Sequence, residues 1–147
     1  MTRTIAAAAA LTLAAAAAQA DIETKMSPDD VATTMDRLEA AVTEAGATVF
    51  ARVDHAQGAA DVGMDLAPAQ LLIFGNPQLG TPAMQDDIRA GLALPMKVLV
   101  YEGEDGTVIA WEEPEEMFDD LEIDDDADYV DQMTGALDNL TSAAAGE

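Results

Sequence analysis

The sequence predicts an α+β domain in which one mixed or antiparallel sheet is covered by helices mainly on one face. Three observations favour this class. Strand-like segments recur along the chain, two long segments repeat apolar residues at helical spacing, and an Asp-Gly pair separates the last two strand-like segments. The expected order is strand, helix, strand, short helix, strand, helix, strand, strand and helix, which a single sheet accommodates.

The predicted strands are alternating or β-branched segments between turn residues. They cover residues 21–25, 48–53, 69–74, 96–101 and 107–111. Asp105-Gly106 lies between the last two and predicts a hairpin, because such a pair favours a tight connection. The third strand is a short apolar run that stops abruptly at Gly75-Asn76-Pro77, where a polar loop would follow.

The predicted helices are bounded by capping residues. Ser27-Pro28 predicts an N-cap and first position, and Gly46 a stop. Asp54 would cap a short turn over residues 55–60, and Thr81-Pro82 would start a helix that Gly91 ends. The last helix is expected over about residues 127–144. The apolar stripes of the two long helices are Val31, Met35, Leu38, Val42 and Ala45, and Val130, Met133, Leu137 and Leu140.

The first 20 residues match a secretory signal peptide, so that residues 21–147 would form one mature domain. Arg3 is followed by an Ala- and Leu-rich stretch, and Ala18-Gln19-Ala20 is a cleavage site of the small-x-small type. The apolar stretch is shorter than the roughly 20 residues that span a bilayer. We therefore expect a periplasmic or secreted protein without membrane insertion. The chain contains no Cys, which excludes disulfides and thiolate sites.

The chain is strongly acidic, with 29 Asp and Glu against six Lys and Arg and a net charge of −23. Removal of Arg3 with the leader would make the net charge −24. This charge repels nucleic acid and anionic membranes and favours basic partners and cations. The acids concentrate after Lys97, above all in the acidic segment at residues 112–131. A solvated surface is the simpler interpretation, and a partner-binding surface is the alternative.

Four segments have an order and spacing that resemble a known family. They are Val49-Phe50-Ala51-Arg52-Val53-Asp54-His55, Phe74-Gly75-Asn76-Pro77, Gly80-Thr81-Pro82-Ala83-Met84 and Leu94-Pro95-Met96-Lys97-Val98-Leu99-Val100. Over residues 21–111 the chain resembles the domain-of-unknown-function family 302. The resemblance implies a small α+β domain, similar in fold to the TATA-binding-protein-like class, often dimeric and with no established activity. The chain departs from the family pattern at residues 112–131.

His55 is the only histidine of the chain, and it follows Asp54 at a strand end. A histidine titrates near neutral pH, so it suits an acid, a base or a ligand, and Asp54 could orient its ring. The alternative is that Asp54 caps the next turn while His55 packs against a nearby loop. Arg52 on the same strand is expected either to pair with a carboxylate or to meet a ligand.

Asn76 is the second candidate, because its amide both donates and accepts hydrogen bonds. If the strands that end at Asp54 and Asn76 are neighbours, His55 and Asn76 would share one sheet edge. With Thr81 and the backbone of Gly80 they would ring a small polar pocket, and a helix start at Thr81 would favour an anion there. The alternative is that the Gly-Asn-Pro segment is only a turn.

The acidic segment contains a partial calcium-loop pattern. Its carboxylates at positions 1, 3, 5, 7, 9 and 12 are Asp120, Glu122, Asp124, Asp126, Asp128 and Asp131. Position 6 is Asp125 where the loop needs Gly, and position 12 is Asp rather than Glu. The sequence therefore predicts at most weak divalent-cation binding, through Asp120, Glu122, Asp124 and Asp126.

No nucleophile or phosphate-loop motif is present in the chain. We therefore expect an exported, non-catalytic domain that binds a small ligand or a protein partner, forms a homodimer and needs no cofactor. Its expected site residues are Arg52, Asp54, His55, Asn76 and Thr81. The alternatives are an acid–base enzyme that uses Asp54 and His55, and a cation-responsive protein that uses the acidic segment.

Overall fold

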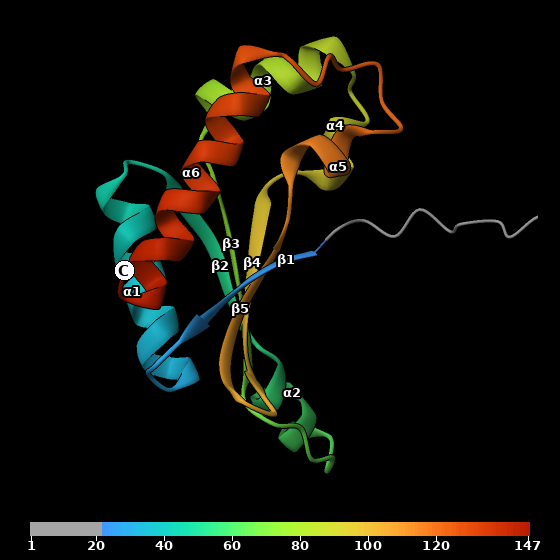
Figure 1. Cartoon of the computed structure of the whole chain (residues 1–147). Coiled ribbons are helices and arrows are strands. Elements are labelled where there is room, and N and C mark those ends of the chain that lie inside the picture. Colours follow the sequence, from blue (N-terminus) through green and yellow to red (C-terminus); the bar gives the residue numbers. More distant parts are fainter. Residues whose placement is uncertain (1–21) are drawn as a thin grey trace, which may run out of the picture.

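The computed structural model describes residues 22–147 (Figure 1), and the predicted leader lies outside the described residues. Five strands form one sheet in the order β1-β5-β4-β3-β2, and every neighbouring pair is antiparallel. The predicted α+β class is confirmed. The strands are β1 (Ile22–Ser27), β2 (Thr48–Asp54), β3 (Ala69–Gly75), β4 (Met96–Gly103) and β5 (Gly106–Glu112).

The two long helices, α1 (Val31–Glu44) and α6 (Asp128–Ala145), pack against each other on the same face of the sheet (Figure 1). The short helix α2 (His55–Asp61) lies at one end of the sheet. The helices α3 (Pro77–Asp86), α4 (Ala90–Ala93) and α5 (Pro114–Phe118) lie at the other end. Every sequence-predicted strand is present, and the two-residue loop before Gly106 confirms the predicted hairpin.

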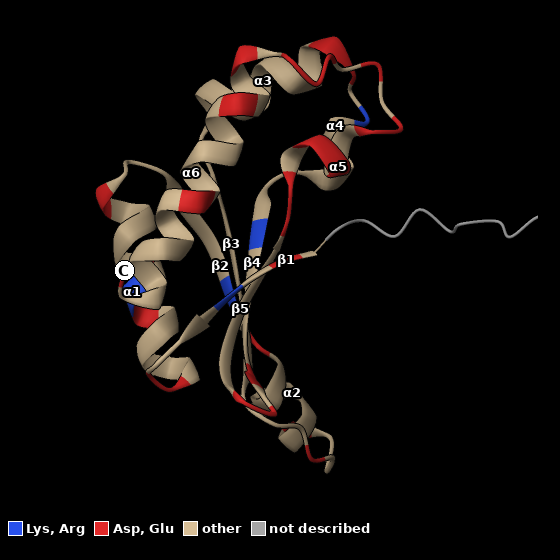
Figure 2. Cartoon of the chain, viewed as in Figure 1, with Lys and Arg blue, Asp and Glu red and all other residues tan. Residues whose placement is uncertain are grey.

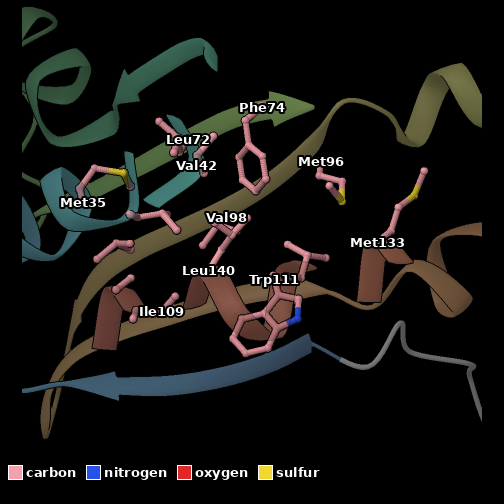
Figure 3. Close-up of a cluster of buried hydrophobic side chains, with 14 of the residues drawn as sticks. Met35, Val42, Leu72, Phe74, Met96, Val98, Ile109, Trp111, Met133 and Leu140 are labelled. Atoms are coloured by element: carbon pink, nitrogen blue, oxygen red, sulfur yellow. The ribbon is translucent and has the colours of Figure 1, made fainter. Parts of the chain in front are cut away.

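The core lies between the sheet and the two long helices (Figure 3). Both predicted apolar stripes are buried there, except for Ala45, which caps the end of α1 and is exposed. The sheet contributes alternate side chains to the same layer, as a half-covered sheet must. The largest of these are Leu72, Phe74, Val98, Val100, Ile109 and Trp111.

The predicted start of α1 is wrong, because the chain continues as a strand through Ser27. The Ser27 hydroxyl is buried and hydrogen-bonds the Thr34 hydroxyl at 2.7 Å. The N-cap is instead Asp30, whose carboxylate accepts from the Thr33 amide at 2.8 Å. Gly46 adopts a φ of 76° just after the helix, which confirms it as the stop.

Lys and Arg are sparse among many Asp and Glu in the described part of the chain (Figure 2). Four of the five Lys and Arg side chains within residues 22–147 are used in ion pairs. Lys25 in β1 pairs with Asp138 in α6, and its ammonium also lies 5.5 Å from the centre of the Trp111 ring in β5. The Lys25–Asp138 ion pair therefore fastens β1 to α6. With so much of the positive charge neutralised inside the molecule, the remaining surface is strongly acidic. The pairs are Lys25–Asp138, Arg37–Asp29, Arg52–Asp36, Arg52–Glu39 and Arg89–Asp87.

No helix in the described part of the chain is long and apolar enough to cross a membrane. The acidic segment is anchored rather than loose, because Pro114 and Phe118 of α5 are buried against the core. Trp111, at the end of β5, is also buried.

Candidate functional site

The structure places His55 and Asn76 at opposite ends of the β2–β3 ladder. Thr48 pairs with Gly75, next to Asn76, whereas Asp54 pairs with Gln70 next to His55. Figure 1 accordingly shows α2, which starts at His55, at the end of the sheet away from α3. The expectation that the two side chains share one recess is therefore wrong. Both residues follow the C-terminal end of a strand, but the C-terminal ends of two antiparallel neighbouring strands lie at opposite ends of their ladder.

Asp54 caps α2, as the alternative interpretation proposed. Its carboxylate accepts from the Gln57 amide at 2.9 Å and from the Gln70 side-chain amide at 3.2 Å. His55 is the exposed first residue of the helix, and within residues 22–147 no side chain hydrogen-bonds its imidazole. Acid–base chemistry needs a ring oriented by a partner and facing a pocket. The described residues give the Asp54–His55 pair no such arrangement.

Arg52 is an ion-pair residue. Its guanidinium contacts Asp36 at 2.6 Å and Glu39 at 3.1 Å on α1, and Gln70 at 2.9 Å on β3. Partial burial lowers the pKa of Arg52, but hydrogen bonds to the two carboxylates outweigh it and raise the pKa above its ordinary value. These contacts tie β2 to the helix layer and confirm the ion-pair interpretation.

Asn76 is the N-cap of α3. Its side-chain oxygen accepts from the Gln78 amide at 2.9 Å, and Pro77 is the first helical residue. The predicted helix start at Thr81 is wrong, because the helix has already begun and Thr81 lies in its second turn. Its predicted end at Gly91 is also wrong, since α3 ends at Asp86 and Gly91 lies in α4.

Asn76 and Thr81 nevertheless share a site, which we call the β3–α3 cavity. It has a volume of about 230 Å³, it is open to solvent, and none of its lining residues is charged. Four strand-end and helix segments enclose it, together with one residue of α6. The lining residues are Phe50, Gly75, Asn76, Pro77, Leu79, Gly80, Thr81, Met84, Gly91, Leu94, Pro95, Met96 and Met133.

Glycines and a β-bulge help to create this space. A side chain on Gly75 would meet Phe50 and Pro95 at 3.5 Å, and one on Gly91 would meet the Met84 sulfur at 3.4 Å. Phe50 has no partner in the β2–β3 register, because the ladder shifts between Val49 and Ala51. Such a bulge re-aims a side chain. Phe50 is 57% exposed and lines the cavity, so its ring lies at the opening.

The chemistry of the cavity is apolar and rich in sulfur. Met84, Met96 and Met133 line it from α3, β4 and α6, and Figure 3 shows the last two extending from facing elements. The polar groups are few. The Asn76 oxygen is used in the cap, whereas its amide nitrogen makes no hydrogen bond within residues 22–147. Thr81 is an exposed residue of the lining. The cavity therefore suits an apolar molecule with one polar group.

The carboxylates of the acidic segment do not form a metal centre in the structure. Within residues 22–147, no three Asp, Glu or His side chains gather as ligands around one point. The calcium-loop spacing at Asp120, Glu122, Asp124 and Asp126 is thus not accompanied by a calcium-loop geometry. A sharp turn at the sixth position would be needed to bring such side chains together, and Asp125 is not suited to it.

Asp87 is a buried polar residue that the sequence patterns did not single out. Its carboxylate accepts from the Arg89 side chain and backbone amide, and from the Glu122 amide at 3.1 Å. Hydrogen bonds from the Arg89 side chain, and then those from the two amides, hold the pKa of Asp87 well below its usual range. This cluster attaches the acidic segment to the α3–α4 corner, which borders the β3–α3 cavity.

A second contact joins the same elements. The Tyr129 hydroxyl on α6 donates to the Asp86 carboxylate of α3 at 2.6 Å. Burial and this hydrogen bond raise the pKa of Tyr129 to about 12. The phenol therefore remains a protonated donor at neutral pH and helps to position α3 over α6.

Comparison with known proteins identifies the family. The model of the family described as "Domain of unknown function DUF302" matches residues 22–140. The chain belongs to the DUF302 family. A crystal structure of an uncharacterised conserved DUF302 protein from Bacillus stearothermophilus superposes with a TM-score of 0.68 over 85% of this chain and 95% of that one. The sequence identity is 19%, so this likeness concerns the fold.

The chain is also similar, over part of its length, to longer curated proteins. Over 78 residues it is 47% identical to the fluoride-specific ion channel FluC 1 of Brucella suis biovar 1 (strain 1330). The aligned stretch covers 53% of this chain and 31% of that protein. FluC 1 of Brucella abortus and FluC 2 of Brucella melitensis match equally, over 29% of their length. The match thus spans less than a third of these relatives.

Proposed function

We propose that this DUF302 protein is an exported, non-catalytic binding domain whose ligand site is the β3–α3 cavity. One observation carries the proposal. Each of the four segments on which the family resemblance was based contributes to the lining, through Phe50, Asn76, Thr81, Met96 and their neighbours. The cavity thus lies where the family-like segments converge. Rigid strand ends and helix starts hold these residues, as a binding site requires.

The Brucella relatives support a binding or interaction role. Each carries a segment similar to part of this chain within a longer protein named as a fluoride-specific ion channel. A domain that accompanies a membrane protein need only recognise a ligand or a partner to be useful there. The same recognition by a separate, exported chain would need no catalytic group.

Filling the cavity tests this proposal. Gly91 lies in α4, and its missing side chain would point at the Met84 sulfur. Uncharged fragments that bind the unaltered protein are first identified by ligand-observed NMR. We expect Gly91→Leu to weaken the binding of these fragments by at least about tenfold, because the leucine side chain would occupy the cavity. Gly135→Leu is the matched control, since Gly135 is an exposed helical glycine at which an added side chain would point into open space.

Circular dichroism and thermal melting establish that both variants keep the fold. Fragments that bind Gly91→Leu and the unaltered protein equally would place the ligand elsewhere. Failure of every fragment to bind the unaltered protein would remove the cavity as a ligand site.

We further propose that the domain is a homodimer that pairs through the uncovered face of the sheet. Both long helices cover the other face, and strand alternation directs apolar side chains outward here. A second copy of the chain is the suitable occupant of this face. The chain has a net charge of −23, so two copies repel each other over most of their surface, but this face contains only one carboxylate, Glu112 at the end of β5. The face comprises Ile22, Thr24, Met26, Ala51, Val53, Ala69, Leu71, Ile73, Lys97, Leu99, Tyr101, Val108, Ala110 and Glu112.

A charge at the centre of this face should separate the copies. Leu99 lies on the central strand, between Leu71 and Ala110. We expect the unaltered protein to sediment as a dimer and Leu99→Lys as a monomer, with Leu92→Lys, at a position 90% exposed, as the control. Salt should strengthen the dimer, since it screens repulsion between two acidic chains. A monomeric unaltered protein at tens of micromolar and high salt would contradict this proposal.

Export is proposed from the leader-like residues 1–20. Expression of the full chain in a bacterium should yield a periplasmic protein whose N-terminal residue is Asp21, as measured by fractionation and intact mass. Replacing the Ala18 and Ala20 pair by bulky residues should block processing, because signal peptidase requires small side chains at the cleavage site. A full-length cytoplasmic product from the unaltered gene would contradict export.

A further inference from the structure

We infer that the β3–α3 cavity selects a small, uncharged aromatic molecule with one hydrogen-bond acceptor, of the size of a substituted phenol. This inference rests on the binding function proposed above and names the class of ligand. It draws on four features of the cavity: its volume, its sulfur-rich wall, the aromatic ring at its opening and the distribution of charge.

The volume sets the size of the ligand. An apolar protein cavity of roughly 150 Å³ is known to hold benzene. The β3–α3 cavity, at about 230 Å³, leaves room for one ring with a few further atoms. A fatty acid or a steroid would protrude widely from a space of this size.

The wall favours an aromatic ring over a saturated one. Thioether sulfurs make favourable contacts with the edges of aromatic rings, and they are polarisable. Met84, Met96 and Met133 all line this one cavity, and the exposed Phe50 ring at the opening offers an edge-to-face or stacking partner. A cyclohexane ring of equal size would gain apolar burial but neither of these specific contacts.

The absence of charged lining residues and the negative charge of the chain disfavour an anionic ligand, and two polar side chains of the lining can position one ligand oxygen. No lining residue carries a charge, while the chain as a whole carries −23, so a carboxylate would be desolvated in a negative field. The Asn76 amide nitrogen, which is not used in the helix cap, and the Thr81 hydroxyl are side-chain donors on residues that line the cavity. They suit a neutral hydroxyl or carbonyl oxygen.

A set of four probes with one methyl-substituted ring each tests the inference. The probes are p-cresol, its saturated analogue 4-methylcyclohexanol, the hydrocarbon toluene and the anion p-toluate. Isothermal titration calorimetry should show p-cresol binding about tenfold more tightly than 4-methylcyclohexanol and more tightly than toluene, with p-toluate weakest. In protein with ¹³C-labelled methionine methyl groups, p-cresol should shift the methyl resonances of Met84, Met96 and Met133. It should not shift those of Met26 and Met64.

A sulfur-deleting variant isolates the thioether contribution. Met84 is only partly buried, so Met84→Leu should fold and keep the apolar volume. Met84→Leu should weaken the binding of p-cresol several-fold and leave the binding of 4-methylcyclohexanol unchanged. Met64→Leu, at a loop position 66% exposed, should change neither.

The outcomes separate the two proposals. Equal binding of p-cresol and 4-methylcyclohexanol at the three methionines would overturn the aromatic inference while the cavity remains the ligand site. Tightest binding of p-toluate would overturn the requirement for a neutral ligand. Binding of none of the four probes, together with no effect of Gly91→Leu on any fragment, would overturn both proposals.

Discussion

Replacing Leu137 by alanine should cost about 2–5 kcal/mol of the free energy of unfolding. Leu137 is 1% exposed, on the face of α6 that packs against the sheet. Truncation removes its apolar contacts and leaves a cavity that the surrounding helix and strands can fill only in part. Since domains of this size are stabilised by roughly 5–15 kcal/mol in total, the variant should unfold at a much lower urea concentration.

Leu92→Ala is the matched control for this prediction. Leu92 is 90% exposed in α4, so the same substitution there should change the free energy of unfolding by less than about 0.5 kcal/mol. Both variants should be measured at one protein concentration, because dimerisation would make stability depend on it. Similar small losses for the two variants would mean that α6 does not form the described core layer.

Replacing Asp87 by alanine should release the acidic segment from the α3–α4 corner. The carboxylate accepts several hydrogen bonds from Arg89 and one from the Glu122 amide. Without this carboxylate, the backbone amides of Arg89 and Glu122 lose their hydrogen-bond acceptor, and the Arg89 guanidinium loses its counter-charge. Hydrogen exchange at the Glu122 amide should accelerate by roughly tenfold or more, while exchange in β4 should change much less.

The effect should depend on pH in a defined direction. The pKa of Asp87 is lowered in the folded state, so its ionised form contributes stability that is complete above the unfolded pKa of about 3.9. That contribution is lost as the pH falls toward the folded value. The difference in stability between the unaltered protein and Asp87→Ala should therefore be constant near neutral pH and shrink below about pH 4. Asp120→Asn, on an exposed neighbouring carboxylate, is the control and should show neither effect.

The helical stripes and the strand segments were predicted well, because local periodicity reports which side chains are buried. Met35 and Leu38 in α1 and Met133 in α6 are buried where the spacing placed them. Helix starts were predicted less well. Ser-Pro and Thr-Pro pairs satisfy the same local capping rules whether or not a helix begins there, and pairing of Ser27 in β1 overrode the first of them.

The site was predicted only in part. Asn76 and Thr81 do lie together, because they are five residues apart on one capped helix. The Asp87 cluster and the methionines of the cavity were missed, since Met84, Met96 and Met133 come from three elements and no local spacing connects them.

The amino-acid sequence by itself determined the α+β class, the strand segments, the apolar faces of the two long helices, the excess of negative charge and the family resemblance, because each of these depends on composition or on neighbours along the chain. Only the tertiary structure decided that His55 and Asn76 lie apart and that Phe50 and three methionines meet around a cavity. The physical reason is that the pairing of strands far apart in the chain, together with a single bulge, sets which distant residues meet. Local periodicity reports only which side of one segment is buried.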